Sequence, residues 1–178
     1  MNALPSEQPV REFLLSEALR FVRAVSRLPG IRRIALIGSL LSEKPEPKDI
    51  DLLITVENEC DLAPLAAAGR RLKGRTQGWN RGADIFLADP EGLYIGRTCH
   101  WRECAPGIRL ACKAQHCGGR YFLHDDLQIV KLSSELILSP VLELWPSTVR
   151  RKALPRDVEE ILVEPLEKSS RREGQDDA

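Results

Sequence analysis

The chain carries no net charge, because its 26 basic and 26 acidic residues cancel over 178 positions. A neutral protein has no global field that would draw it onto nucleic acid or an anionic membrane. The sequence also lacks an apolar run long enough to span a bilayer, and its N-terminus lacks the basic start and apolar core of a secretion signal. We therefore expect a cytoplasmic protein with no membrane partner, whose five cysteines are reduced thiols or metal ligands rather than disulfides.

The sequence contains no internal repeat, and its 43% hydrophobic and 29% charged content is ordinary for one globular domain. Apolar spacing predicts two helices and three strands in the first half of the chain. Their order, helix, strand, strand, helix, strand, predicts an α+β fold in which a mixed sheet has helices on one side. The helices cover residues 9–28 and Asp61 to about Lys73, and the strands cover Ile31 to Ile37, Asp49 to Val56 and the residues around Asp84.

After Pro90 the periodic pattern gives way to short pieces rich in Gly, Cys, His and Arg. We therefore divide the chain into a core at residues 1–90, a Cys/His-rich module with a C-terminal extension of the same domain at 91–168, and a disordered tail at 169–178. Within the extension the sequence predicts extended segments at 127–132 and 135–145, and a last helix over 156–168 that is capped by Asp157 and broken near Pro165.

Two aspartates, Asp49 and Asp51, stand at the head of an apolar run. Alternate residues of a strand share a face, so both carboxylates point the same way while Ile50 points into the core. Two like charges side by side need a cation, and oxygen ligands suit Mg²⁺, which takes its remaining ligands from water and substrate phosphates. The alternative is that these carboxylates are only the solvated end of a sheet.

A Gly-Ser pair, Gly38 and Ser39, follows the first predicted strand. A glycine here lets the backbone approach a triphosphate closely, and the serine offers a hydroxyl and an N–H. By itself the pair is more typical of a plain turn. A third carboxylate, Asp84, heads another short apolar strand, so that three strand-borne aspartates can converge near the pair.

The combined pattern is Gly-Ser, a spacer of about ten residues, Asp-x-Asp and a separate strand-borne Asp. It resembles the DNA polymerase β superfamily of nucleotidyltransferases over roughly residues 31–89, and the minimal, single-domain members are closest in size. The resemblance implies nucleotide binding by Gly38 and Ser39, and catalysis with Mg²⁺ binding by Asp49, Asp51 and Asp84.

The reaction implied by this resemblance moves a nucleoside monophosphate from a nucleoside triphosphate to an acceptor, such as an RNA end, a protein hydroxyl or a small molecule. One alternative is a degenerate relative that binds nucleotide or RNA without turnover. Another is a regulatory protein, since minimal members are often paired with a small helical partner in toxin-antitoxin systems. One departure from the family is the presence of Pro45 and Pro47 in the spacer, which limits the helix after Gly-Ser to a turn or so.

Four of the five cysteines fall within one short segment that also contains two histidines. Thiolates and imidazoles gathered this tightly indicate tetrahedral Zn²⁺. The spacing C-x4-C-x7-C-x4-C lacks the C-x2-C turns of common zinc ribbons, and small buried hydrophobes are the alternative role for these cysteines. The first choice of zinc ligands is Cys99, Cys104, Cys112 and Cys117, with His100 or His116 able to replace a neighbour.

Residues 95–120 also carry five basic side chains against a single acid, Glu103. Metal binding supplies folding free energy to a segment that is too poor in apolar residues to fold alone. With zinc bound, we expect Arg109 and Arg120 to present cations to the triphosphate or to the acceptor.

Overall fold

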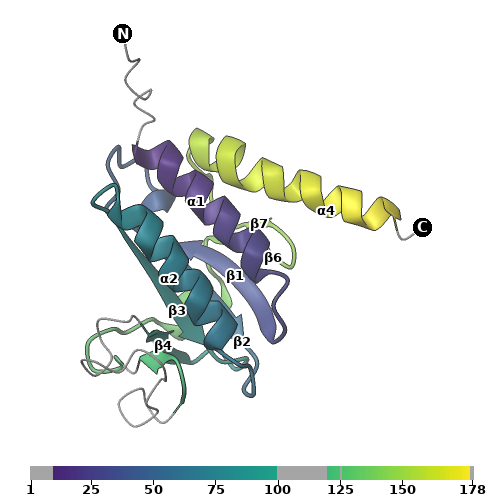
Figure 1. Cartoon of the computed structure of the whole chain (residues 1–178). Helices are drawn as coiled ribbons and strands as arrows, with labels where there is room; N and C mark the ends of the chain where they lie inside the picture. Colours follow the sequence, from purple (N-terminus) through teal and green to yellow (C-terminus); the bar gives the residue numbers. More distant parts are fainter. Residues whose placement is uncertain (1–9, 100–119, 125, 177–178) are drawn as a thin grey trace.

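The computed structural model describes residues 10–99, 120–124 and 126–176, and over these residues the chain forms an α+β fold with a mixed seven-stranded sheet (Figure 1). The strand order is β5-β4-β3-β2-β1-β6-β7. Strands β2 and β3 are parallel, and the other neighbouring pairs are antiparallel. The strands are β1 (Ile31–Ile37), β2 (Asp49–Val56), β3 (Gly82–Ala88), β4 (Tyr94–Thr98), β5 (Leu123–His124), β6 (Leu142–Trp145) and β7 (Val149–Arg150).

Two long helices, α1 (Val10–Val25) and α2 (Ala63–Gln77), lie side by side on one face of the sheet (Figure 1). The apolar positions of α1 recur every three or four residues, so one face of the helix is buried. Alternate residues of β1 and β2 pack against this helical layer. The buried set includes Leu14, Ala18, Phe21 and Val25 of α1 and Ile34, Leu36, Ile50, Leu52 and Ile54 of the strands.

The first half of the predicted element order is confirmed. The strands β1, β2 and β3 have the predicted positions, and α2 begins just after Asp61, whose carboxylate accepts the Ala63 N–H at 3.0 Å. A single 3₁₀ turn, η1 (Gly38–Leu41), follows β1, as expected from the prolines in the spacer. Buried apolar segments of these lengths strongly favour the strand or helix that their spacing predicts.

Residues 91–145 differ from the sequence-based prediction. Strand β4 was not expected, because Gly96 interrupts its alternation with a φ of 129°. Residues 127–132 form turns and irregular structure rather than a strand. The predicted extended segment at 135–145 is half helix, because the Ser133 side chain caps α3 (Ser134–Leu138) by accepting the Leu136 N–H at 3.2 Å.

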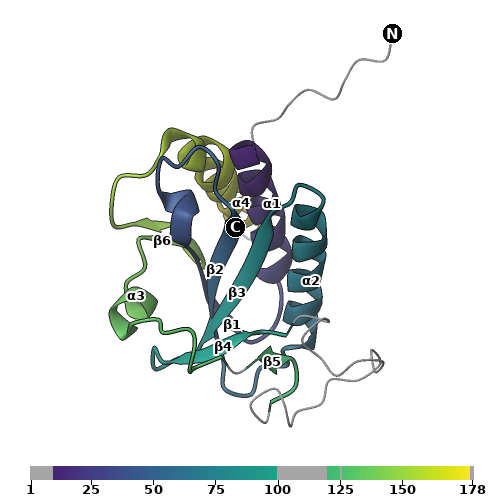
Figure 2. The same ribbon diagram turned by 90° about the vertical axis from the view of Figure 1, so that its left-hand side faces the viewer.

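The prediction that helices occupy only one side of the sheet was wrong in one respect. The short helix α3 lies on the face opposite α1 and α2 (Figure 2). Its Ile137 is fully buried in a second, smaller apolar cluster with Ala35, Ile37, Leu53 and Ala88 of the strands. The aspartates described below lie on this same second face.

The C-terminal region is more helical than predicted. Asp157 accepts the Val158 N–H at 2.9 Å, as expected, at the start of a π-helix, η4 (Val158–Val163), which continues into α4 (Glu164–Asp176). Pro165 does not break the helix, because it lies in the first turn of α4, after the π-helix. A helix thus replaces most of the predicted disordered tail. Among the described residues, no helix is both long and apolar enough to cross a bilayer.

Arg11 connects three parts of the fold. Its guanidinium is buried and donates to the carbonyls of Leu40 at 2.8 Å and Lys44 at 3.1 Å, in the segment after β1. It also pairs with both carboxylate oxygens of Asp157 at the start of η4. Arg11 therefore fixes the turn that contains Gly38 against α1 and the C-terminal helices.

We predict that Arg11→Ala lowers the free energy of unfolding by about 2–3 kcal/mol, because it leaves a carboxylate and two carbonyls without their donor. Urea denaturation followed by circular dichroism measures the change. The matched control is Arg156→Ala, whose side chain is exposed and pairs along its own helix, with Glu160. This control should change stability by less than about 0.5 kcal/mol. Equal stability of the two variants would contradict the role given to Arg11.

Candidate functional site

Three aspartates lie on the face of the sheet opposite α1 and α2. In the parallel pairing of β2 with β3, Asp51 is directly opposite Asp84 and Asp49 is opposite Gly82. Paired residues of neighbouring strands project to the same face, about 4.8 Å apart along the hydrogen-bonding direction. Ile50 projects to the other face and is fully buried in the main core. The structure thus brings Asp49, Asp51 and Asp84 together at the start of two adjacent strands.

Two glycines make room for the carboxylates. A Cβ at Gly38 would lie 2.2 Å from Oδ2 of Asp51, and a Cβ at Gly82 would lie 2.1 Å from Oδ1 of Asp49. Gly38 also has a φ of 78°, in the left-handed region that favours glycine. The Gly-Ser turn therefore touches the aspartates directly. Gly82 was not predicted as a site residue, because its only signal in the sequence is a glycine at the head of an apolar strand.

We predict that Gly38→Ala destabilises the protein by about 1–3 kcal/mol, because the new methyl group strains the backbone and displaces the Asp51 carboxylate. The matched control is Gly74→Ala in α2, where an added Cβ meets no atom within 4 Å. Alanine is the better helix former, so this control should stabilise by about 0.5–1 kcal/mol. Urea denaturation of both variants measures the two changes. A neutral or stabilising Gly38→Ala would show that the turn is not held against Asp51.

The environment of Asp51 raises its pKa to about 6. Burial is the largest cause, followed by the negative charges of Asp84 and then Asp49. A divalent cation would remove this repulsion, and Mg²⁺ needs only one or two protein carboxylates alongside water and phosphate oxygens. Asp49 and Asp51 are therefore chemically suited to hold Mg²⁺.

This shift in pKa predicts a pH-dependent stability. The folded-state pKa of Asp51 lies above the unfolded value, so its favourable contribution is complete below about pH 4 and is lost as the pH rises through about 6. In EDTA, Asp51→Asn should be about 1–2 kcal/mol more stable than the wild type at pH 7.5, and the gain should disappear at pH 4. Urea denaturation across this range measures it.

The control for this titration is Glu91→Gln, which removes an exposed carboxylate in the turn after β3, at the other end of that strand from Asp84. Its stability relative to the wild type should stay constant between pH 4 and 7.5. If Asp51→Asn behaves in the same way, Asp51 is not held near other negative charges.

A basic side chain joins the aspartates from β4. Arg97 contacts Oδ1 of Asp84 through Nη1 at 3.0 Å and Oδ2 of Asp126 through Nε at 2.5 Å. Asp126 is buried and also accepts the Tyr94 hydroxyl at 2.7 Å. Burial, and next the hydrogen bond to Asp126, raise the pKa of Tyr94. Arg97 therefore partly neutralises the cluster and fixes the orientation of Asp84.

The position of Arg97 changes the expected role of Asp84. The sequence predicted three carboxylates around shared metal ions, whereas Asp84 pairs with a guanidinium in the structure. Across residues 10–99, 120–124 and 126–176, no group of three or more His, Cys, Asp or Glu side chains is arranged to hold a metal ion. Sequence reasoning missed Arg97 and Asp126 as site residues because β4 was not expected to be a strand.

The predicted nucleotide-binding pair occupies the end of β1. Ser39 is half-buried in the η1 turn, and its carbonyl accepts the Ser42 N–H at 3.1 Å and the Ser42 hydroxyl at 2.8 Å. These bonds close the turn into one compact unit next to Asp51. Gly38 and Ser39 are thus placed where a ligand of the aspartates would meet backbone rather than bulky side chains.

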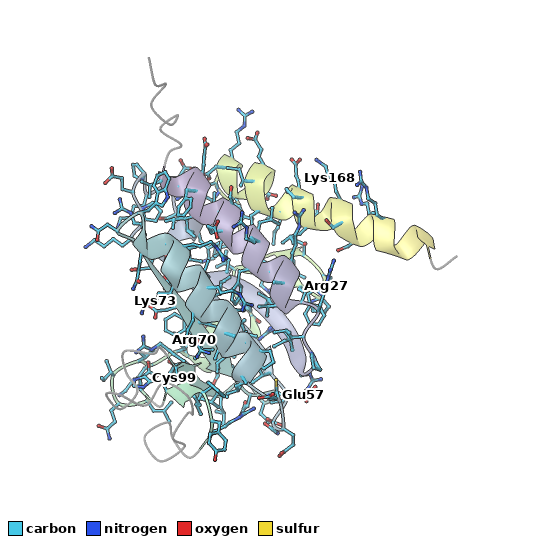
Figure 3. All side chains as sticks on the ribbon, viewed as in Figure 1. Arg27, Glu57, Arg70, Lys73, Cys99 and Lys168 are labelled. Atoms are coloured by element: carbon cyan, nitrogen blue, oxygen red, sulfur yellow. The ribbon has the colours of Figure 1, made fainter. Side chains whose placement is uncertain are left out.

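Most of the predicted zinc site lies outside the described residues. Cys99 is buried, and its N–H donates to the Phe122 carbonyl at 2.8 Å (Figure 3). Zinc binding by this segment stays a prediction. The remaining candidates outside the described residues are His100, Cys104, Cys112, His116 and Cys117, together with Arg109.

Arg120 does not lie where the sequence analysis expected it. Its guanidinium donates to the Cys60 carbonyl at 2.7 Å, just beyond Val56, the last residue of β2. The aspartates lie at the first residues of the same strand. Arg120 therefore anchors a loop at the opposite end of the sheet, and it presents no cation to the carboxylates.

Comparison of the chain with protein-family models, with curated proteins and with solved structures gave no match. What this site can do is therefore argued from its own residues: the spacing of the motif along the sequence, and the proximity of its side chains in the fold.

Proposed function

We propose that this protein is a Mg²⁺-dependent nucleotidyltransferase that moves a nucleoside monophosphate from a nucleoside triphosphate to an acceptor hydroxyl. The observation that carries the proposal is the pairing of Asp51 with Asp84 across parallel strands, with Asp49 and the Gly38 turn beside them. This arrangement has the order and spacing that resemble the polymerase β superfamily. The polymerase β-like identity of the fold is part of the same proposal.

The side chains have distinct roles in this proposal. Asp49 and Asp51 hold Mg²⁺, which when bound neutralises triphosphate oxygens and makes an acceptor hydroxyl more acidic. The Gly38-Ser39 turn binds the triphosphate through its backbone, since no side chain at Gly38 blocks the approach. Positioning and charge neutralisation supply most of the rate enhancement in such transfers.

The state of Asp51 gives the site a pH requirement. Because its pKa is raised to about 6, the carboxylate is ionised at neutral pH and becomes protonated in mild acid. Protons and Mg²⁺ compete for this carboxylate, so nucleotide transfer at limiting Mg²⁺ should fall as the pH drops below about 6. Asp84 receives its orientation from Arg97 and can accept the acceptor proton in this geometry.

One observation favours a second function, the binding of a nucleotide or RNA without turnover. The Arg97 guanidinium occupies part of the place that a cation would take beside Asp84. In such a protein, charge neutralisation by Arg97 would replace neutralisation by a metal. Pyrophosphate release separates the two functions, because only the transferase produces it.

The test uses each α-labelled nucleoside triphosphate in turn, with Mg²⁺ and cell extract as the source of acceptor. The readouts are label transfer and pyrophosphate release. We expect transfer by the wild type, normal transfer by the Glu91→Gln control, and a loss of at least about 100-fold in Asp51→Asn, which keeps the size of the side chain but removes its charge.

Two outcomes would contradict the proposal. Transfer by Asp51→Asn near the wild-type rate would show that the chemistry occurs elsewhere. Binding of a nucleoside triphosphate, with or without Mg²⁺, and no pyrophosphate release from any of the nucleoside triphosphates would assign the protein to the second function.

A further inference from the structure

A groove with a volume of about 450 Å³ runs between α1, the end of β6 and α4. Figure 1 shows α1 on the helical side of the sheet and the body of α4 diverging from it, and the groove that these helices line is on the same side. It therefore lies on the face opposite the aspartates, and nothing in the proposed function uses it. Its lining residues are Val22, Arg23, Ser26, Arg27, Leu144, Trp145, Pro146, Leu166, Ser169, Ser170 and Arg172.

The groove is positively charged. It contains three arginines, Arg23, Arg27 and Arg172, all exposed, and none of its described lining residues is acidic. Figure 3 shows Arg27 at the end of α1, on the side below α4. Within the described part of the chain, none of the three forms an ion pair; the guanidinium of Arg23 contacts only the Pro165 carbonyl at 3.5 Å and the Ser169 hydroxyl at 3.4 Å.

Two acidic residues of α4 are engaged elsewhere. Glu164 pairs with Lys168 at 3.1 Å, and Figure 3 shows Lys168 on the outer side of the helix. Glu167 pairs with Arg150 at 2.8 Å. In a protein of zero net charge, the groove therefore has a local excess of positive charge that its own acidic side chains do not neutralise.

An aromatic ring lies among these charges. Trp145 is half-buried at the end of β6 and lines the groove next to the exposed Pro146. A large flat ring beside several guanidiniums is the combination that binds single-stranded nucleic acid, because phosphates bind the cations while a base stacks on the ring. A membrane surface would need a protruding apolar face, and a phosphorylated peptide would need no ring for stacking.

We propose that the α1–α4 groove binds a short single-stranded nucleic acid segment. Arg23, Arg27 and Arg172 contact successive phosphates, and one base stacks on Trp145. The footprint is short, as a neutral protein requires, since only three phosphates are neutralised. This binding does not depend on the proposed transferase activity.

The test measures the affinity of fluorescent single-stranded RNA and DNA 12-mers by anisotropy, in EDTA so that no transfer occurs. With three phosphate contacts, the logarithm of the association constant should fall with the logarithm of salt concentration with a slope of about −2. The double variant Arg23→Glu with Arg27→Glu should lose at least tenfold in affinity and flatten this slope.

Two sets of variants complete the test. The charge-reversal control is Arg71→Glu, on the exposed side of α2, which should bind as the wild type does. Trp145→Leu should lose about tenfold with an unchanged salt slope, because stacking does not involve counterions, while Trp145→Phe retains most of the affinity. Rescue by phenylalanine excludes a simple folding defect.

Several results would overturn the inference. Wild-type affinity in the double arginine variant, or equal losses in the variant and the Arg71→Glu control, would show that the groove does not bind the oligonucleotide. Duplex RNA bound as tightly as the single strand would exclude stacking on Trp145. Binding to phosphatidylserine vesicles with none to oligonucleotides would assign the charge to a membrane contact.

Discussion

The site depends on one constraint, the parallel pairing of β2 with β3. This register fixes Asp51 beside Asp84 and places both at the start of their strands, where the chain enters the sheet. A shift by one residue would turn every side chain of the strand to the other face, burying the carboxylates and exposing Ile50 and Leu52. The apolar core under the sheet therefore holds the aspartates together against their mutual repulsion.

The surroundings of the aspartates limit the cost of this repulsion. Arg97 places one positive charge between Asp84 and the buried Asp126, and Tyr94 completes the hydrogen bonds of Asp126. On the other side, Arg11 holds the segment after Gly38 by its carbonyls. The cluster is thus partly neutralised from β4 and fixed in position from α1, while Asp51 stays next to the negative charges of Asp84 and Asp49.

The sequence predicted the elements whose burial is periodic. Strands β1 to β3 and helices α1 and α2 follow from apolar spacing, because each of them covers the same core. The three aspartates and Gly38 could be predicted as site residues because the motif is defined by spacing along the chain. Recognising it requires no knowledge of tertiary contacts.

The features of the fold and site that the sequence did not predict depend on contacts between residues far apart in the chain. Strand β4 contains a glycine with positive φ, so its sequence does not show the alternation of apolar and polar residues that predicts a strand. Without that strand, Arg97 could not be predicted as a partner of Asp84. Pro165 predicts a helix break, yet the π-helix before it lets the chain continue to Asp176. The groove beside Trp145 arises only when α4 has been placed next to α1.

The electrostatic account of the site is tested most directly by NMR titration of the side-chain carboxyl carbon of Asp51, in the wild type and in Asp84→Asn. The account predicts a midpoint near pH 6 in the wild type and a lower midpoint in the variant, because one of the nearby negative charges has been removed. A wild-type midpoint near the ordinary value of about 4, or a midpoint that Asp84→Asn leaves unchanged, would contradict it.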